Sequence, residues 1–290
     1  MTSYHGKDWD NTAAALAMAV GREEIAHAAV LTGRAFACVN REPGPFAWLV
    51  PAMRPAEALV SAVRLLAGDA RTLSLEPPSD EVLLSLARTL LRESAVVVGP
   101  AITPLFASRP ASHFSGVAAH FLVIHESSRD GTWVVHDPEG CPFLRMTGDD
   151  LATALRDAEV VVGVTPTATW DTEAVLRTAW TRGIALRRAC RSSANGAALR
   201  EVAGCVTTGL RGSDVAALQA SLPALSVARA QLSTAARTLG FHVAAEILVE
   251  AVSSAATCIA AVTDRDQKAL VVALRAAAAV EDAFDDKVTP

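Results

Sequence analysis

Two residues that could move a proton together, one histidine and one aspartate, stand at the ends of neighbouring strand-like segments. These segments are residues 120–125 and 132–136, with His120 at the start of the first and Asp137 just after the second. If residues 127–130 form a four-residue hairpin loop, counting back along both strands places His120 opposite Asp137 on the same face. A carboxylate beside an imidazole holds one tautomer and stabilises the imidazolium that forms during proton transfer. The pair therefore predicts a general base with its orienting carboxylate.

The same spacing also has a purely structural interpretation. Asp137-Pro138 is typical of a turn that ends a strand, and His120 is then a partly buried histidine without a chemical role. In addition, a slip of one residue in the register turns Asp137 to the other face of the sheet. The geometry of the pair decides between the two interpretations.

Histidines and cysteines do not form a recognisable metal-binding pattern. The spacings of His113, His120, His125 and His136 match no zinc signature. His120 and His125 are expected to point to opposite faces of one strand because their positions differ by five, an odd number. The five cysteines are widely spaced and contain no CxxC pair. We therefore expect no metal, no other cofactor, no disulfide framework and a reducing, cytoplasmic environment.

The elements that must position the pair begin with a helix close to the N-terminus. Asp10-Asn11-Thr12 is a run of cap-type residues, followed by the helix formers Ala13 to Val20, and Gly21 is expected to end the helix. The other elements expected before residue 165 are helices at 56–67 and 82–91, a short helix capped by residues 147–150, and strands at 95–98 and 160–164.

From Asp171 onward the sequence carries helix signals and no strand signal. The expected helices are residues 171–191, 197–210, 214–238, 242–262 and 264–285. Pro223 is expected to break or kink the third of them. Because strands occur early and helices late, we predict an α+β domain over residues 1–168 and an all-α domain over residues 169–290.

Composition excludes several classes of protein. With 290 residues, of which 51% are hydrophobic, the chain is long enough for two cores and is not disordered. A formal charge of −5 and the lack of a long basic run argue against nucleic-acid binding. The polar start argues against a signal peptide, and Glu246 and Glu250 mark the apolar stretch 243–262 as a packed helix rather than a membrane span.

Two segments resemble a known family. The segment AHFLVIHESSRDGTWVVHDP (residues 119–138) resembles the histidine-to-aspartate hairpin of papain-like proteins related to bacteriocin leader peptidases, and DNTAAALAM (residues 10–18) resembles their nucleophile helix. Residues 85–106 and His113-Phe114 extend the match. The whole chain resembles the butirosin biosynthesis protein H family, which implies a papain-like, cysteine-peptidase-like N-terminal domain and a helical C-terminal domain.

The resemblance implies acyl transfer from a carrier-protein thioester to an aminoglycoside amine, with a cysteine nucleophile at the start of the first helix. Aligning Leu16 with the family's leucine places Asn11 where that cysteine stands. Asparagine is not a competent acyl-transfer nucleophile. Thr12 could replace it as nucleophile if His120 activated it, but the favoured interpretation of Thr12 is an ordinary threonine at a helix start. Cys38 and Cys141 are interpreted as packing residues.

Five further residues are candidate substrate contacts. His5 occupies the place where related peptidases carry an oxyanion-hole glutamine, although it could also be a mobile N-terminal residue. Trp9 could wall the cleft and stack on a substrate, or form a hydrophobic staple before the helix. Asp10 and Thr12 flank the replaced cysteine, and His113 precedes the hairpin.

Two functional hypotheses follow for a protein of bacterial natural-product or antibiotic biosynthesis. In the first, His120 acts as a general base oriented by Asp137, Asn11 holds a substrate oxygen, and an acyl group or amide bond reacts without a covalent intermediate. In the second, the chain is a papain-like pseudoenzyme that binds a small molecule, a carrier protein or a partner enzyme. Expected partners are a small-molecule substrate and an acyl carrier protein, and the Ala-rich helices could form either a homodimer interface or an internal core.

Overall fold

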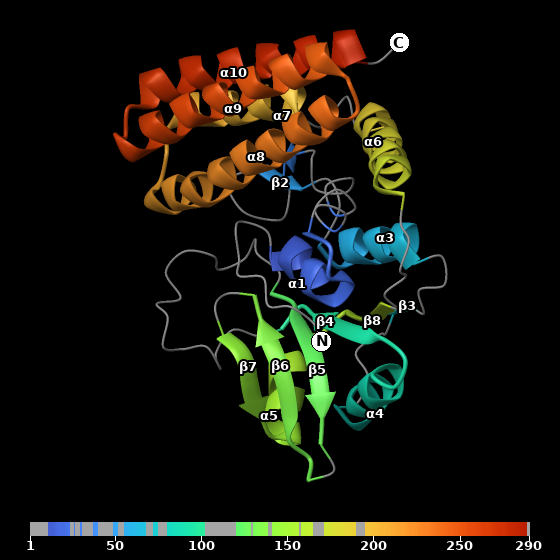
Figure 1. Ribbon diagram of the computed structural model, residues 1–290. Helices are drawn as coiled ribbons and strands as arrows, with labels where there is room; N and C mark the ends of the chain where they lie inside the picture. Colours follow the sequence, from blue (N-terminus) through green and yellow to red (C-terminus); the bar gives the residue numbers. More distant parts are fainter. Residues whose placement is uncertain are drawn as a thin grey trace. The chain divides into compact units, whose positions relative to one another are not determined.

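The computed structural model shows a chain with both helices and strands (Figure 1). The structure describes residues 11–23, 26, 30, 37–39, 49–51, 55–67, 72–74, 80–101, 120–128, 130–138, 141–156, 158–164, 171–189 and 195–288. Four of the predicted site residues, His5, Trp9, Asp10 and His113, lie outside this part of the chain. Contacts divide the chain into two units, one of residues 1–30 and 55–175 and another of residues 31–54 and 176–290.

The first unit is built on a six-stranded antiparallel sheet. Its strands lie in the order β3-β8-β4-β5-β6-β7. The bounds are β3 Thr72–Ser74, β4 Ala95–Gly99, β5 Leu122–Ser127, β6 Trp133–Asp137, β7 Cys141–Met146 and β8 Val160–Val164. The central strands β4 and β8 are almost wholly buried, because their valine-rich sequences place apolar side chains on both faces.

Helices cover both faces of this sheet. On one face, α1 (Asn11–Val20) and α3 (Pro55–Ala67) share a core with Val97 and Val123. On the other face, α4 (Asp80–Leu90) and α5 (Gly148–Leu155) share a core with Trp133, Val96 and Val98. Thr147 caps α5 in a capping box with Asp150, which confirms the predicted start of this helix.

The second unit contains a two-stranded hairpin and a set of long helices. The hairpin joins β1 (Ala37–Val39) to β2 (Leu49–Pro51), and it contacts α7 and α8. The helices are α6 Thr172–Ala189, α7 Gly196–Thr208, α8 Gly212–Thr238, α9 His242–Thr263 and α10 Gln267–Val288. These bounds agree closely with the five helices predicted from the sequence. The hairpin was not predicted, and the prediction had assigned its residues to the first domain.

A buried cluster of charges lies among the helices of the second unit. Glu281 on α10 accepts hydrogen bonds from Arg229 Nε (2.6 Å) on α8 and Arg187 Nη1 (2.9 Å) on α6. Arg187 Nε also donates to Asp285, and Arg229 Nη2 donates to Asn195 Oδ1 at 3.0 Å. All five residues are at most 6% exposed. The cluster therefore joins α6, α8, α10 and the start of α7 through paired charges.

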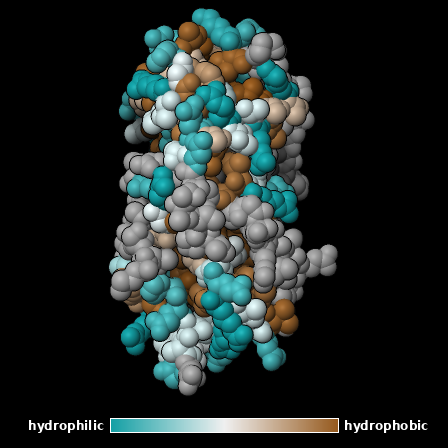
Figure 2. All heavy atoms as spheres, turned by 45° about the vertical axis from the view of Figure 1, so that its right-hand side comes forward, coloured by the Kyte–Doolittle hydropathy of each residue, from teal (hydrophilic) through white to brown (hydrophobic). Residues whose placement is uncertain are grey.

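Helices α8 and α9 bear on two expectations from the sequence, the effect of Pro223 and the nature of the apolar stretch 243–262. Helix α8 continues through Pro223, so of the two predicted effects of this proline, a break or a kink, the break does not occur. Helix α9 is the one helix of the described ranges that is long and apolar enough to cross a membrane, but it packs against α8 and α10, and a core helix passes the same test. In the space-filling view of the molecule, hydrophilic and hydrophobic side chains are interspersed on the face turned toward the viewer (Figure 2).

Candidate functional site

The site is built around Asn11, the first residue of α1. The helix NTAAALAMAV is buried along its whole length, because small alanines let it pack closely against the sheet. It ends at Gly21, whose φ of +71° is a conformation that glycine adopts without strain. Asn11 is only 6% exposed, and Thr12 beside it has no exposed surface. The N-terminus of α1 thus carries a buried amide at the position where the family resemblance would place a cysteine nucleophile.

Asn11 makes two contacts with the segment just before β5. Its Oδ1 accepts a hydrogen bond from the backbone N–H of Phe121, and its Nδ2 lies 3.3 Å from Nδ1 of His120. The Phe121 N–H fixes which end of the amide is the oxygen, so the NH₂ group faces the imidazole. Because NH₂ only donates, His120 Nδ1 must accept, and the neutral imidazole carries its proton on Nε2.

Asp137 lies on the opposite side of the same imidazole. Its Oδ1 is 3.0 Å from Nε2 of His120, within ion-pair distance although not as a well-aligned hydrogen bond. The two residues are 6% and 2% exposed. The Nε2 proton inferred from Asn11 therefore faces a buried carboxylate, which is the orientation that stabilises an imidazolium. The structure thus brings Asn11, His120 and Asp137 together, as the sequence predicted.

The register that brings His120 to Asp137 differs from the predicted one. The strands pair Val123 with His136, so the residue directly opposite Asp137 is not His120, and the loop spans residues 128–132. A bulge between Ile124 and Glu126 adds a residue to β5. Relative to the predicted register, the pairing at the start of β5 is shifted by two residues, an even number, so the pair stays in contact despite the wrong register.

Gly99 at the end of β4 helps to position the backbone of His120. The His120 carbonyl accepts a 2.6 Å hydrogen bond from Ala101 N. A Cβ on Gly99 would lie 2.8 Å from that carbonyl oxygen and 2.6 Å from Cδ1 of Phe121, closer than real Cβ atoms approach. Only glycine therefore leaves room for this path of the chain. Sequence reasoning gave Gly99 no role, because the contact is between segments distant in the sequence.

A second group of rings lies next to the site. The rings of His125 and His136 have centroids 5.0 Å apart, and Phe143 packs edge-on against both. The Phe143 N–H donates to His136 Nδ1 at 3.2 Å, although Phe143 has a φ of +53° and is 56% exposed. Burial, and then the nearby charge of His125, lower the pKa of His136 below its ordinary value. Cys141, interpreted from the sequence as a packing residue, begins β7 and pairs with Asp137.

No group of three potential metal ligands occurs among the residues that the structure describes. The side chains of the site offer an acceptor nitrogen at His120 Nδ1, an amide donor at Asn11 and a carboxylate at Asp137. In comparisons with known proteins, no family model matches the chain, and no curated protein matches it.

Proposed function

We propose that the chain is a papain-like acyltransferase or amide-bond-forming enzyme that works by general base catalysis without a covalent intermediate. The observation that carries the proposal is the alignment of three buried polar groups, with Asn11 Nδ2 at 3.3 Å from His120 Nδ1 and Asp137 at 3.0 Å from Nε2. Asn11, His120 and Asp137 follow one another in the order of nucleophile, base and orienting group in a cysteine peptidase. The nucleophile position holds an amide here. The family resemblance supports the same arrangement.

In the proposed reaction, an acceptor amine attacks the carbonyl carbon of a thioester. Asn11 NH₂ turns from His120 Nδ1 to the carbonyl oxygen and stabilises the negative charge that develops there. His120 Nδ1 takes the proton of the amine, and Asp137 stabilises the imidazolium. The tetrahedral intermediate then collapses, the C–S bond breaks, and the proton passes from His120 to the departing thiolate. The products are an amide and a free thiol, and His120 is again neutral.

The proposed substrates follow from the resemblance. They are a small-molecule amine and an acyl group on a small thiol or an acyl carrier protein, in the cytoplasm of a bacterium that makes a natural product such as an antibiotic. Neither the amine nor the acyl group needs a metal or redox cofactor for this reaction, since only proton transfer and bond exchange are involved.

A specific observation also favours a second candidate function. Both ring nitrogens of His120 are occupied, Nδ1 by the Asn11 amide and Nε2 by the carboxylate of Asp137. If the amide does not move, the base nitrogen is blocked, and the chain is a pseudoenzyme that binds a small molecule, a carrier protein or a partner enzyme.

One assay separates the two functions. The purified full chain is mixed with acyl N-acetylcysteamine thioesters and an aminoglycoside, and thiol release and amide mass are followed. The enzyme proposal expects amine-dependent thiol release that falls about a hundredfold or more in His120→Ala, and no acyl adduct on the protein. Full turnover in His120→Ala and Asn11→Ala contradicts it, and an acyl adduct on Thr12 contradicts the non-covalent route. Ligand-induced stabilisation without turnover supports the pseudoenzyme.

A further inference from the structure

Helices α8 and α9 end in the same type of turn, but with different residues at its critical position. In both turns the same pattern of backbone hydrogen bonds closes the helix around one residue with positive φ. That residue is Gly240 after α8, with φ +78°, and Arg265 after α9, with φ +56°. This left-handed conformation costs free energy for arginine, because of its Cβ, and not for glycine. Glycine is therefore the usual residue at this position. The turn after α9 therefore carries an arginine that its backbone does not favour.

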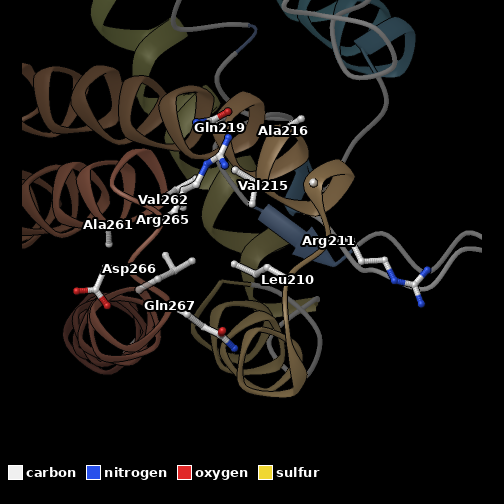
Figure 3. Close-up of a pocket in the computed structure, with 12 residues that line it drawn as sticks. Leu210, Arg211, Val215, Ala216, Gln219, Ala261, Val262, Arg265, Asp266 and Gln267 are labelled. Carbon is white, nitrogen blue, oxygen red and sulfur yellow. The ribbon is translucent and has the colours of Figure 1, made fainter.

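A cavity of about 490 Å³ lies beside this turn, within the second unit. It is formed by the α7–α8 connection, the first turns of α8, the end of α9 and the start of α10 (Figure 3). Its apolar lining comes mainly from Leu210, Val215, Val262 and Leu270. Cavities of this size are typical of small-molecule sites with an apolar wall and few polar groups.

Arg265 supplies the positive charge of this cavity. Figure 3 shows its side chain extending from the turn toward Gln219 on α8, while Arg211 points away from the other lining residues. Among the residues that the structure describes, the Arg265 guanidinium has no ion pair or hydrogen bond. Asp266, the acidic residue of the lining, accepts a hydrogen bond from Ala269 N at 2.9 Å and so caps α10. Its negative charge is set against the positive charges of Arg211 and Arg265, so the charged side chains of the lining are positive on balance.

We propose that this cavity binds a small amphipathic carboxylate. The alkyl part lies over Leu210, Val215, Val262 and Leu270, and the carboxylate pairs with the guanidinium of Arg265, whose planar fork suits two parallel hydrogen bonds. The ligand explains why an arginine occupies a position suited to glycine, because its charge is needed at the mouth of an apolar cavity. This site is independent of the chemistry at His120.

The test exploits the conflict between folding and binding at Arg265. Sodium decanoate, below its micelle concentration, is titrated into the full chain by calorimetry, with acetate and decan-1-ol as probes that lack the tail or the charge. In Arg265→Gly, decanoate affinity should fall about tenfold or more. The thermal midpoint of the same variant without ligand should stay equal or rise, because the turn gains its favoured residue.

Arg211→Gln is the matched control, since it also removes one positive charge from the lining, but from a side chain that points away from the other lining residues. It should retain the decanoate affinity of the parent. The proposal is overturned if decanoate does not bind, if acetate or decan-1-ol binds as well as decanoate, or if Arg265→Gly binds as tightly as the parent. A loss of affinity in Arg211→Gln alone would also overturn the assignment to Arg265.

Discussion

Asn11 holds the imidazole of His120 through its NH₂ group while the Phe121 N–H holds the amide oxygen. These contacts lead to a specific protonation pattern, because a nitrogen that accepts from NH₂ has no proton of its own. Neutral His120 should therefore carry its proton on Nε2. The measurement is the ¹⁵N chemical shift of both ring nitrogens in the neutral imidazole. Asn11→Ala should weaken the preference of the His120 proton for Nε2. A proton on Nδ1 in the parent would show that the Asn11 amide is oriented the other way.

Replacement of Asn11 by cysteine should create a reactive thiol. The new Sγ would lie at the N-terminus of α1 and beside His120 Nδ1, and both features lower a thiol pKa from about 8.5 to between roughly 3.5 and 7.5. At pH 6 we expect alkylation of this residue by iodoacetamide to be about tenfold or more faster than that of an ordinary cysteine. Peptide mapping by mass spectrometry gives the rate at position 11 separately from the five native cysteines.

The control for this variant is the double variant Asn11→Cys with His120→Ala. It keeps the thiol and the helix N-terminus but removes the imidazole, so alkylation at pH 6 should slow. Equal rates in the two proteins would mean that the side chain at position 11 does not act with His120, and the proposed catalytic arrangement would be wrong.

Gly99→Ala should disturb the site through the backbone. The added Cβ would meet the His120 carbonyl oxygen, which has no side-chain freedom to move away. We expect a loss of about 1–3 kcal/mol in the free energy of unfolding and slower alkylation in the Asn11→Cys background. Gly163→Ala in β8 is the matched control, because it adds the same methyl group to the same sheet, where the Cβ would lie 2.6 Å from Ser94 Oγ, away from His120. It should destabilise the fold but leave the alkylation rate unchanged, whereas equal effects on the rate would remove the specific role of Gly99.

The sequence predicted some parts of this structure well and others poorly, for physical reasons. Helices α6 to α10 were found because capping and breaking residues mark their ends locally. The contact of His120 with Asp137 was also predicted, although the register was wrong, because the bulge beside His125 leaves no clear local signal. Strand β7 was missed, since Gly140 and Pro142 are typical turn residues in the sequence.

The buried charges of the helical unit give a prediction about stability. Burial alone would raise the pKa of Glu281, but the charges of Arg229 and Arg187 outweigh it and hold the pKa below its ordinary value. Glu281→Gln leaves two buried arginines with one carboxylate partner, so we expect a loss of about 3–5 kcal/mol in the free energy of unfolding. The exposed pair of Arg200 and Asp282 is the comparison, and Arg200→Gln should cost about 0–1 kcal/mol. Urea unfolding measures both, and similar losses would show that burial does not strengthen the cluster.

His136 should make stability depend on pH. Its pKa is lowered in the folded chain, first by burial and then by His125, so the unfolded chain binds a proton more readily. The stabilisation is therefore fully present above pH 6.5, the ordinary histidine value, and is lost as the pH falls from there toward the folded pKa. Protonation would also remove the acceptor of the Phe143 N–H at Nδ1.

Urea unfolding of the parent and of His136→Asn between pH 5 and 8 tests this dependence. Asparagine can place its Oδ1 near the position of Nδ1 and accept from Phe143, but it does not titrate. The difference in unfolding free energy between the two proteins should be constant above pH 6.5 and should shift in favour of the variant below it. A difference that stays constant over the whole range would mean that His136 has the same pKa in the folded and unfolded chains, and that its burial beside His125 does not penalise its charge.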